Sequence, residues 1–180
     1  GMEAPSAMDS DIYVSQIFSI ILGGGMSSRL FQEVREKRGL CYSIFSTIDS
    51  ISDSGMFTIY AATSEDKILQ LSDVIVDELK RCAEKVTSEE LNRARAQIKA
   101  GMLMGLESTI NRAERLARTI TLWNRVVPIS ETVEKIDNVN LNQLKDFGEN
   151  LCNKKESSLV FYGPMSSCLD LANITKNLAN

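Results

Sequence analysis

The stretch that decides the fold is GGGMSSRLFQEVREKRGLCYS, residues 23–43. It opens on three glycines, where a preceding helix can end, because glycine adopts the backbone conformations that a helix C-terminus requires. Ser27 or Ser28 can cap a second helix that extends to about Lys37. Gly39 then interrupts the helix. The stretch therefore predicts a helix, a tight junction, a second short helix and the start of a strand.

The second helix of this stretch carries a dense group of charges. Glu33 and Lys37 are four residues apart, a spacing that places opposite charges side by side on a helix. On this interpretation Arg29 and Arg38 also belong to a solvated, charged face.

The residues on either side extend the pattern. Upstream, apolar residues at helical spacing predict a helix from Asp11 or Ile12 to Leu22. Downstream, two runs of alternating character, 42–48 and 56–61, are separated by a stretch rich in Ser and Asp, and they predict an antiparallel hairpin.

The rest of the chain is dominated by predicted helices, each with a polar residue at its start. The expected starts are Thr63 with Asp66 as a capping box, Thr87 with Glu90 as a clearer one, Ser108, Ser130 and Asn140. A short strand is expected over 158–162 and a terminal helix over 169–178. Strands around a block of helices predict an α+β fold, a two-layer domain with a mostly antiparallel sheet packed against several helices.

Composition excludes several classes of function. The chain has 180 residues, Lys+Arg 20 against Asp+Glu 24, a net charge of −4 and no histidine. This length fits one domain. Without an imidazole, the chain cannot form a His-containing zinc triad or a Ser/His/Asp triad. The acidic balance argues against nucleic-acid binding, and no apolar run is long enough to span a membrane. The four cysteines are widely spaced, which favours reduced thiols in an intracellular protein, with a disulfide as the alternative.

Residues 23–43 resemble the signature of the C-terminal half of the insulinase/pitrilysin zinc peptidases, in the branch that contains the β-type mitochondrial processing peptidase and its bacterial homologues. Further matches follow in the family's order: Ser-Asp-Ser-Gly at 52–55, the helix that starts at Thr87, and Leu-Glu-Ser-Thr from Leu106. The resemblance covers nearly the whole chain. It implies a processing-peptidase-like α+β fold in which two related halves close around a peptide substrate.

The resemblance also implies a division of chemistry between the halves. In the family, the N-terminal half holds zinc through a His-x-x-Glu-His motif, so no metal ligand is expected in this chain. The C-terminal half contributes an Arg and a Tyr seven residues apart that contact the substrate. By position these are Arg35 and Tyr42. Arg35 is then a substrate-binding residue, and Tyr42 both binds substrate and stabilises the oxyanion during catalysis.

The resemblance sets expectations for boundaries and surroundings as well. Gly1 and Met2 are interpreted as a remnant of an expression vector, and the domain as residues 3–180. The family's first strand is expected to end near residues 3–6, so it is truncated here. Cys41 replaces a small residue and is interpreted as tolerated packing. The expected location is the bacterial cytoplasm, or the mitochondrial matrix for a eukaryotic source.

Two functions remain open at this point, and a third, a free-standing small binding module, is disfavoured because the first strand is truncated. In the first, the chain is the substrate-clamping domain of a zinc metalloendopeptidase, inactive alone, whose partners are the zinc-binding N-terminal half and a peptide, with a homodimer or heterodimer possible. In the second, the chain belongs to a non-catalytic scaffold or regulatory subunit of the same family. An intact or degraded zinc motif in the full-length protein distinguishes them.

Overall fold

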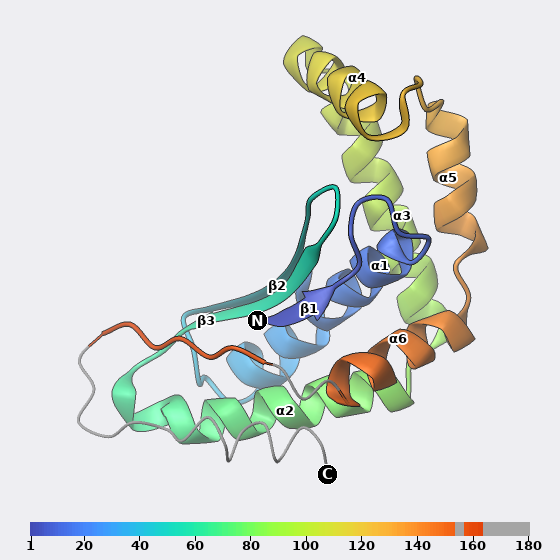
Figure 1. The fold of residues 1–180 in the computed structure, drawn as a ribbon. Helices are drawn as coiled ribbons and strands as arrows, with labels where there is room; N and C mark the ends of the chain where they lie inside the picture. Colours follow the sequence, from blue (N-terminus) through green and yellow to red (C-terminus); the bar gives the residue numbers. More distant parts are fainter. Residues whose placement is uncertain (154–156, 164–180) are drawn as a thin grey trace.

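A computed structural model describes residues 1–153 and 157–163. A three-stranded antiparallel sheet, in the order β1-β3-β2, lies against helices (Figure 1). The strands are β1 (Met2–Ala4), β2 (Ser43–Ser50) and β3 (Gly55–Ala62). The predicted α+β class is confirmed.

The predicted hairpin is confirmed and is longer than expected. β2 and β3 pair over eight residues, from Ser43 opposite Ala62 to Ser50 opposite Gly55. Alternate residues of β2, Ile44 and Ser46, are buried, as expected for a sheet with one covered face.

Helix α1 (Ile12–Gly23) covers that face of the sheet. Its Phe18 is fully buried and meets Phe57 of β3 and Phe147 edge to face, with ring centroids 6.3 and 5.3 Å apart. At the end of α1, a Cβ on Gly23 would lie 2.5 Å from the Ser46 amide nitrogen, so only glycine permits this approach. The glycine run therefore ends the helix, as predicted, and also lets it lie close to the sheet.

Helices make up most of the remaining described chain. After a 3₁₀ turn at Glu65–Lys67 come α2 (Ile68–Glu84), α3 (Ser88–Gly105), α4 (Thr109–Trp123), α5 (Ile129–Asn138) and α6 (Leu141–Asn153). Helices α2 and α6 pack closely together, and α3 leads away from them toward α4 and α5 (Figure 1).

Most of the predicted helix starts are correct. Thr87 and Glu90 form a reciprocal capping box, and the Ser108 side chain accepts a hydrogen bond from the Asn111 amide. Asn140 and Gln143 bond reciprocally in the same way at the start of α6.

Two predicted starts are wrong. The Thr63 hydroxyl does not cap a helix, because it donates to the Leu40 carbonyl at 2.5 Å and a 3₁₀ turn intervenes before α2. Helix α5 begins at Ile129 with Pro128 as its N-cap, so Ser130 lies inside it. Pro128 makes no side-chain cap hydrogen bond, and its φ of −60° suits the entry to a helix.

The strand predicted over 158–162 is also wrong. Only Ser157 forms a bridge, to Met2, and the Ser158 amide donates to the Gly1 carbonyl. The apolar side chains of Val160 and Tyr162 are exposed, so the alternation buries no face. The helix predicted over 169–178 lies outside the described residues.

The first strand ends at Ala4, within the predicted position, and occupies an edge of the sheet. Met2, interpreted from the sequence as a vector remnant, is buried in β1 and pairs with Phe57. Across the described residues, none of the helices is long and apolar enough to cross a membrane.

Candidate functional site

The charged segment after the glycines forms a π-helix, η1 (Phe31–Glu36), in place of the expected α-helix through Lys37. The Lys37 amide donates to the Gln32 carbonyl, five residues back. Single π turns occur frequently at functional sites, because the extra residue per turn redirects side chains. Here the π turn contains Arg35.

Buried residues on both sides fix the position of η1. Leu30 and Val34 are fully buried, and Leu40 enters the same core. Gly39 has φ +58°, a left-handed conformation in which the chain turns from η1 toward β2. The Lys67 ammonium donates to the Gly39 carbonyl at 2.9 Å and ties this turn to the start of α2.

This framework brings Arg35 and Tyr42 together. The Arg35 guanidinium carbon lies 4.7 Å from the centroid of the Phe31 ring and 6.0 Å from that of Tyr42. Both distances are within the range of cation–π attraction. The Tyr42 amide donates to the Ala62 carbonyl at 2.8 Å, which anchors its backbone to the sheet, while its side chain is 83% exposed.

The charges of the segment are not equivalent. Glu33 accepts from Lys37 at 2.5 Å and from Arg38 at 2.7 Å, and these hydrogen bonds hold the pKa of the Glu33 carboxyl below its usual value. The predicted pairing of Glu33 with Lys37 is confirmed. Among residues 1–153 and 157–163, no carboxylate forms an ion pair with Arg35. Within the described residues, the charge of Arg35 is thus not neutralised by an ion pair, in contrast to those of Lys37 and Arg38.

A shallow depression of about 420 Å³ adjoins the pair. Its lining includes Cys41, Tyr42, Thr63 and Lys67. Partial burial raises the pKa of the Cys41 thiol, and the nearby Arg35 charge opposes this shift. Cys41 is therefore a neutral thiol at neutral pH.

Arg29 differs from the sequence interpretation, because it is not part of a solvated face. Its guanidinium binds both carboxylate oxygens of Glu90, at 2.7 and 2.8 Å, and donates to the Lys85 carbonyl at 2.6 Å. Arg29 and Glu90 are 61 residues apart in the sequence, so the spacing of neighbouring residues could not predict this ion pair.

The Arg29–Glu90 pair affects the ionisation of both groups. Burial alone would raise the pKa of the Glu90 carboxyl, but hydrogen bonds from Arg29 and Thr87 outweigh burial and lower it. Burial likewise opposes the charge of Arg29, and the Glu90 hydrogen bonds raise the pKa of the guanidinium overall. The pair links the start of η1 to the start of α3.

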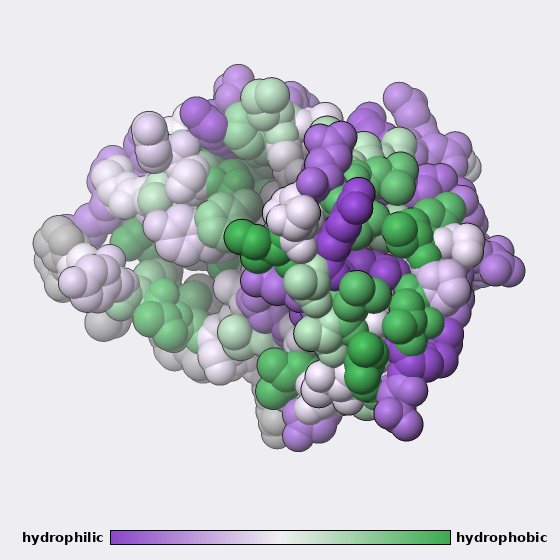
Figure 2. Space-filling model, turned by 90° about the horizontal axis from the view of Figure 1, so that it is seen from above, coloured by the Kyte–Doolittle hydropathy of each residue, from purple (hydrophilic) through white to green (hydrophobic). Residues whose placement is uncertain are grey.

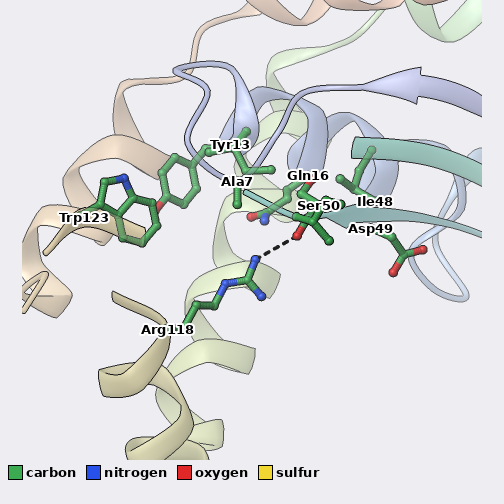
Figure 3. A pocket seen from close by; sticks show the side chains of 10 residues that line it. Ala7, Tyr13, Gln16, Ile48, Asp49, Ser50, Arg118 and Trp123 are labelled. Atoms are coloured by element: carbon green, nitrogen blue, oxygen red, sulfur yellow. Dashed lines mark hydrogen bonds between the residues drawn. The ribbon is translucent and has the colours of Figure 1, made fainter. Parts of the chain in front are cut away.

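A second cavity, of about 410 Å³, lies between α1, the end of β2 and α4 (Figure 3). Arg118 of α4 reaches across it and donates to the Ser50 carbonyl at 3.2 Å. Tyr13 and Trp123 lie at one side and Asp49 at the other (Figure 3). This cavity shares no lining residue with the depression at Tyr42.

The residues present do not fit a zinc site. The chain has no histidine, and the part of it that the structure describes contains no group of three or more Cys, Asp and Glu placed to hold a metal ion. Of the predicted site residues, Arg35 and Tyr42 lie together, and sequence reasoning missed Phe31 as the platform under Arg35.

Comparison with known proteins identifies the family. Residues 1–98 match the model of the peptidase M16 inactive domain. An uncharacterized zinc protease of Rickettsia bellii is 36% identical over 91% of this chain, and one of Bacillus subtilis is 36% identical over 78%. The matches cover 40% and 34% of those relatives, so the chain spans well under half of their length.

Solved structures agree with this assignment. A peptidase M16 inactive domain from Pseudomonas fluorescens superposes with a TM-score of 0.66 at 25% identity, over 80% of this chain and 34% of that one. A chain of Complex III2 from Candida albicans superposes with a TM-score of 0.84 over 98% of this chain and 45% of its own length, at 20% identity, and shows the shared fold. The family predicted from residues 23–43 is confirmed: the chain belongs to the peptidase M16 zinc protease family, as its inactive domain.

Proposed function

We propose that this domain is the substrate-holding half of a zinc metalloendopeptidase and acts on peptides together with a zinc-binding N-terminal half of the same protein. The observation that supports this most directly is the pair formed by Arg35, which has no ion-pair partner in the described part of the chain, and the exposed Tyr42 beside it. Relatives that carry the name zinc protease support the class of reaction.

The two side chains offer different hydrogen-bonding chemistry. A guanidinium presents several donors in a fixed plane and can hold the carbonyl groups of an extended peptide. A phenol presents one O–H donor, which suits the oxygen of the scissile carbonyl as negative charge develops on it. We therefore assign peptide binding to Arg35, and both binding and oxyanion stabilisation to Tyr42.

Zinc belongs, in this proposal, to the N-terminal half. This chain supplies no imidazole, and its described carboxylates and thiols do not converge on a metal. The isolated domain is accordingly expected to be inactive. What its own residues contribute is the position of the peptide and a hydrogen bond to the reacting carbonyl oxygen.

The test uses the full-length protein and a fluorogenic peptide library. We expect Tyr42→Phe to lower kcat about 100-fold with little change in KM, as removal of an oxyanion donor does. Arg35→Ala is expected to raise KM about 10-fold, because it removes a contact made with the bound peptide. Zinc content, measured in every variant, should equal that of the wild type.

Matched controls lie close to both residues. Tyr60→Phe removes another exposed phenol of the sheet, and Arg38→Ala removes a guanidinium that is paired with Glu33. Both controls should keep wild-type kcat and KM. Wild-type kinetics in Tyr42→Phe and Arg35→Ala would refute the assigned roles, and a full-length protein that neither binds zinc nor cleaves peptides would favour the scaffold subunit.

A further inference from the structure

The depression of about 420 Å³ lies where the chain enters β2 and leaves β3. Residues 39–42 form one wall, residues 62–64 form the other, and Lys67 completes the lining. The Thr63 hydroxyl donates to the Leu40 carbonyl at 2.5 Å and so joins the two walls. Hydrogen bonding at the open end of the hairpin therefore fixes the shape of the depression.

The depression has a positive charge that no carboxylate in its lining balances. Among the described residues that line it, Lys67 is the single charged one. The Lys67 side chain is partly buried, and one of its three N–H donors is used on the Gly39 carbonyl, at 2.9 Å. In the part of the chain that the structure describes, Lys67 forms no ion pair. Two donors and the positive charge are thus available to a ligand.

The charges around the depression add to this positive potential or leave it in place. The Arg35 guanidinium carbon lies 6.0 Å from the centroid of the Tyr42 ring, so a second cation adjoins the depression. Asp66 follows Ser64 closely in sequence, and a hydrogen bond from the Ser64 side chain is the main cause of the lowered pKa of the Asp66 carboxyl. The charge of Lys67 contributes less to that shift. Asp66 is therefore held mainly by Ser64.

The depression differs from the apolar surface of the molecule. Figure 2, which views the molecule from the α4 end, shows hydrophobic residues gathered in its right half, where α3, α4 and α5 lie. Helix α2 begins on the opposite side, where β3 leads into it (Figure 1). A basic depression with partly polar walls selects its ligand by charge more than by apolar burial.

We propose that this depression binds a carboxylate of the peptide substrate through the Lys67 ammonium. The carboxylate is that of an Asp or Glu side chain or of the peptide's C-terminus, which present the same two oxygens. The inference rests on the proposed function for the peptide itself. It adds selectivity, because the contacts assigned to Arg35 and Tyr42 are made with backbone carbonyls, which every peptide has.

Substitutions of Lys67 separate its charge from its bond to the Gly39 carbonyl. Lys67→Gln keeps an N–H donor for that carbonyl and removes the charge, whereas Lys67→Arg keeps both. Lys80→Gln is the matched control, because Lys80 is another partly buried lysine of α2 that forms no ion pair with the described residues. Thermal denaturation checks that each full-length variant is folded.

Isothermal titration calorimetry measures the affinity of each full-length protein for synthetic peptides, with a zinc chelator present so that the peptides stay intact. Each position of one short sequence carries Glu in one peptide and Gln in its pair. Every peptide is made with a free and with an amidated C-terminus. The first comparison tests an acidic side chain as the source of the carboxylate, and the second tests the C-terminus.

We expect the wild type to bind the carboxylate form about fivefold more tightly in one of the two comparisons, as a partly exposed ion pair allows. The preference should disappear in Lys67→Gln and persist in Lys67→Arg and Lys80→Gln. No preference in the wild type, or a preference that Lys67→Gln retains, would overturn the inference. Equal losses in Lys67→Gln and Lys80→Gln would assign the effect to net charge and would overturn it as well.

Cleavage of the same peptides by the zinc-loaded protein separates this inference from the proposed function. Lys67→Gln should raise KM for the preferred peptide about fivefold and leave kcat unchanged, because the contact is made equally in the ground and transition states. Cleavage with equal kcat/KM for the carboxylate and amide forms would refute the inference and sustain the peptidase. A protein that cleaves no peptide but shows the Lys67-dependent affinity would do the reverse.

Discussion

Phe31 acts at the scale of a single residue, as the platform on which the Arg35 guanidinium rests. Replacing it by leucine keeps an apolar side chain and removes the ring face. Cation–π contacts at partly exposed sites contribute about 0.5–1 kcal/mol. We therefore expect Phe31→Leu in the full-length protein to raise KM about threefold, with kcat and thermal stability near wild type.

Phe45→Leu is the matched control for this change. Phe45 is an exposed aromatic residue of the sheet that stacks on Tyr60, 5.0 Å between centroids, whereas the Arg35 guanidinium contacts the rings of Phe31 and Tyr42. The KM of the Phe45→Leu protein should stay at the wild-type value. Equal KM values in the two variants would show that the Phe31 ring does not position Arg35.

The residue scale also shows what the sequence could predict. Arg35 and Tyr42 were assigned by position in a motif, and the structure places them side by side. Phe31 and Glu90 were not assigned a role at the site. Phe31 lies in a π turn, and the sequence pattern there predicts an α-helix instead. Glu90 binds Arg29, which is 61 residues away in the sequence. Local spacing carries neither kind of information.

At the scale of elements, the Arg29–Glu90 pair joins η1 to α3, and its contribution to the free energy of unfolding depends on pH. The folded pKa of Glu90 is lower than its usual value of 4.5, so the pair contributes stability that is fully present above that value and is lost as pH falls through the lowered pKa. We expect Glu90→Ala to lower the free energy of unfolding by about 2 kcal/mol at pH 7, between the values typical of surface and buried pairs. The deficit should shrink as pH falls below 4.5, measured by urea denaturation.

Glu89→Ala is the control on the preceding residue. The Glu89 side chain is exposed, and its nitrogen–oxygen distance to Arg93 is 3.9 Å. Its substitution should change stability by less than about 0.5 kcal/mol at any pH. A Glu90→Ala deficit that stayed constant from pH 7 to pH 3 would contradict the ionic origin of the effect.

Element boundaries followed the sequence wherever a local signal set them. Thr87, Ser108 and Asn140 each accept a hydrogen bond from an amide three residues ahead, which is a contact that the sequence itself encodes. Thr63 failed as a cap because its hydroxyl bonds a carbonyl of a distant turn instead. The strand predicted over 158–162 failed because pairing needs a neighbouring strand, and β1 is only three residues long.

At the scale of the whole molecule, the body of the domain depends on close approach between α2, α6 and α1. A Cβ on Gly148 would lie 2.7 Å from Ala83 Cα and 2.8 Å from the Phe18 ring. Gly148→Ala must therefore separate α6 from both neighbours. We expect it to lower the free energy of unfolding by about 2 kcal/mol, as overpacking does.

Gly101→Ala is the matched control, because a Cβ there meets no heavy atom within 4 Å. Alanine is the better helix former, so this variant should be as stable as wild type or about 0.5–1 kcal/mol more stable. Thermal or urea denaturation of the two variants measures the difference. A Gly148→Ala protein as stable as Gly101→Ala would show that the helices are not in close contact.

The cavity between α1, β2 and α4 gives the chain a built-in spectroscopic reporter. The sequence has one tryptophan, Trp123, and it ends α4 at the margin of the cavity shared with Tyr13 (Figure 3). All indole fluorescence of this chain therefore originates at the end of α4. Its emission wavelength records the polarity around the end of α4, so a shift to the blue would report closer packing around Trp123 without any added dye.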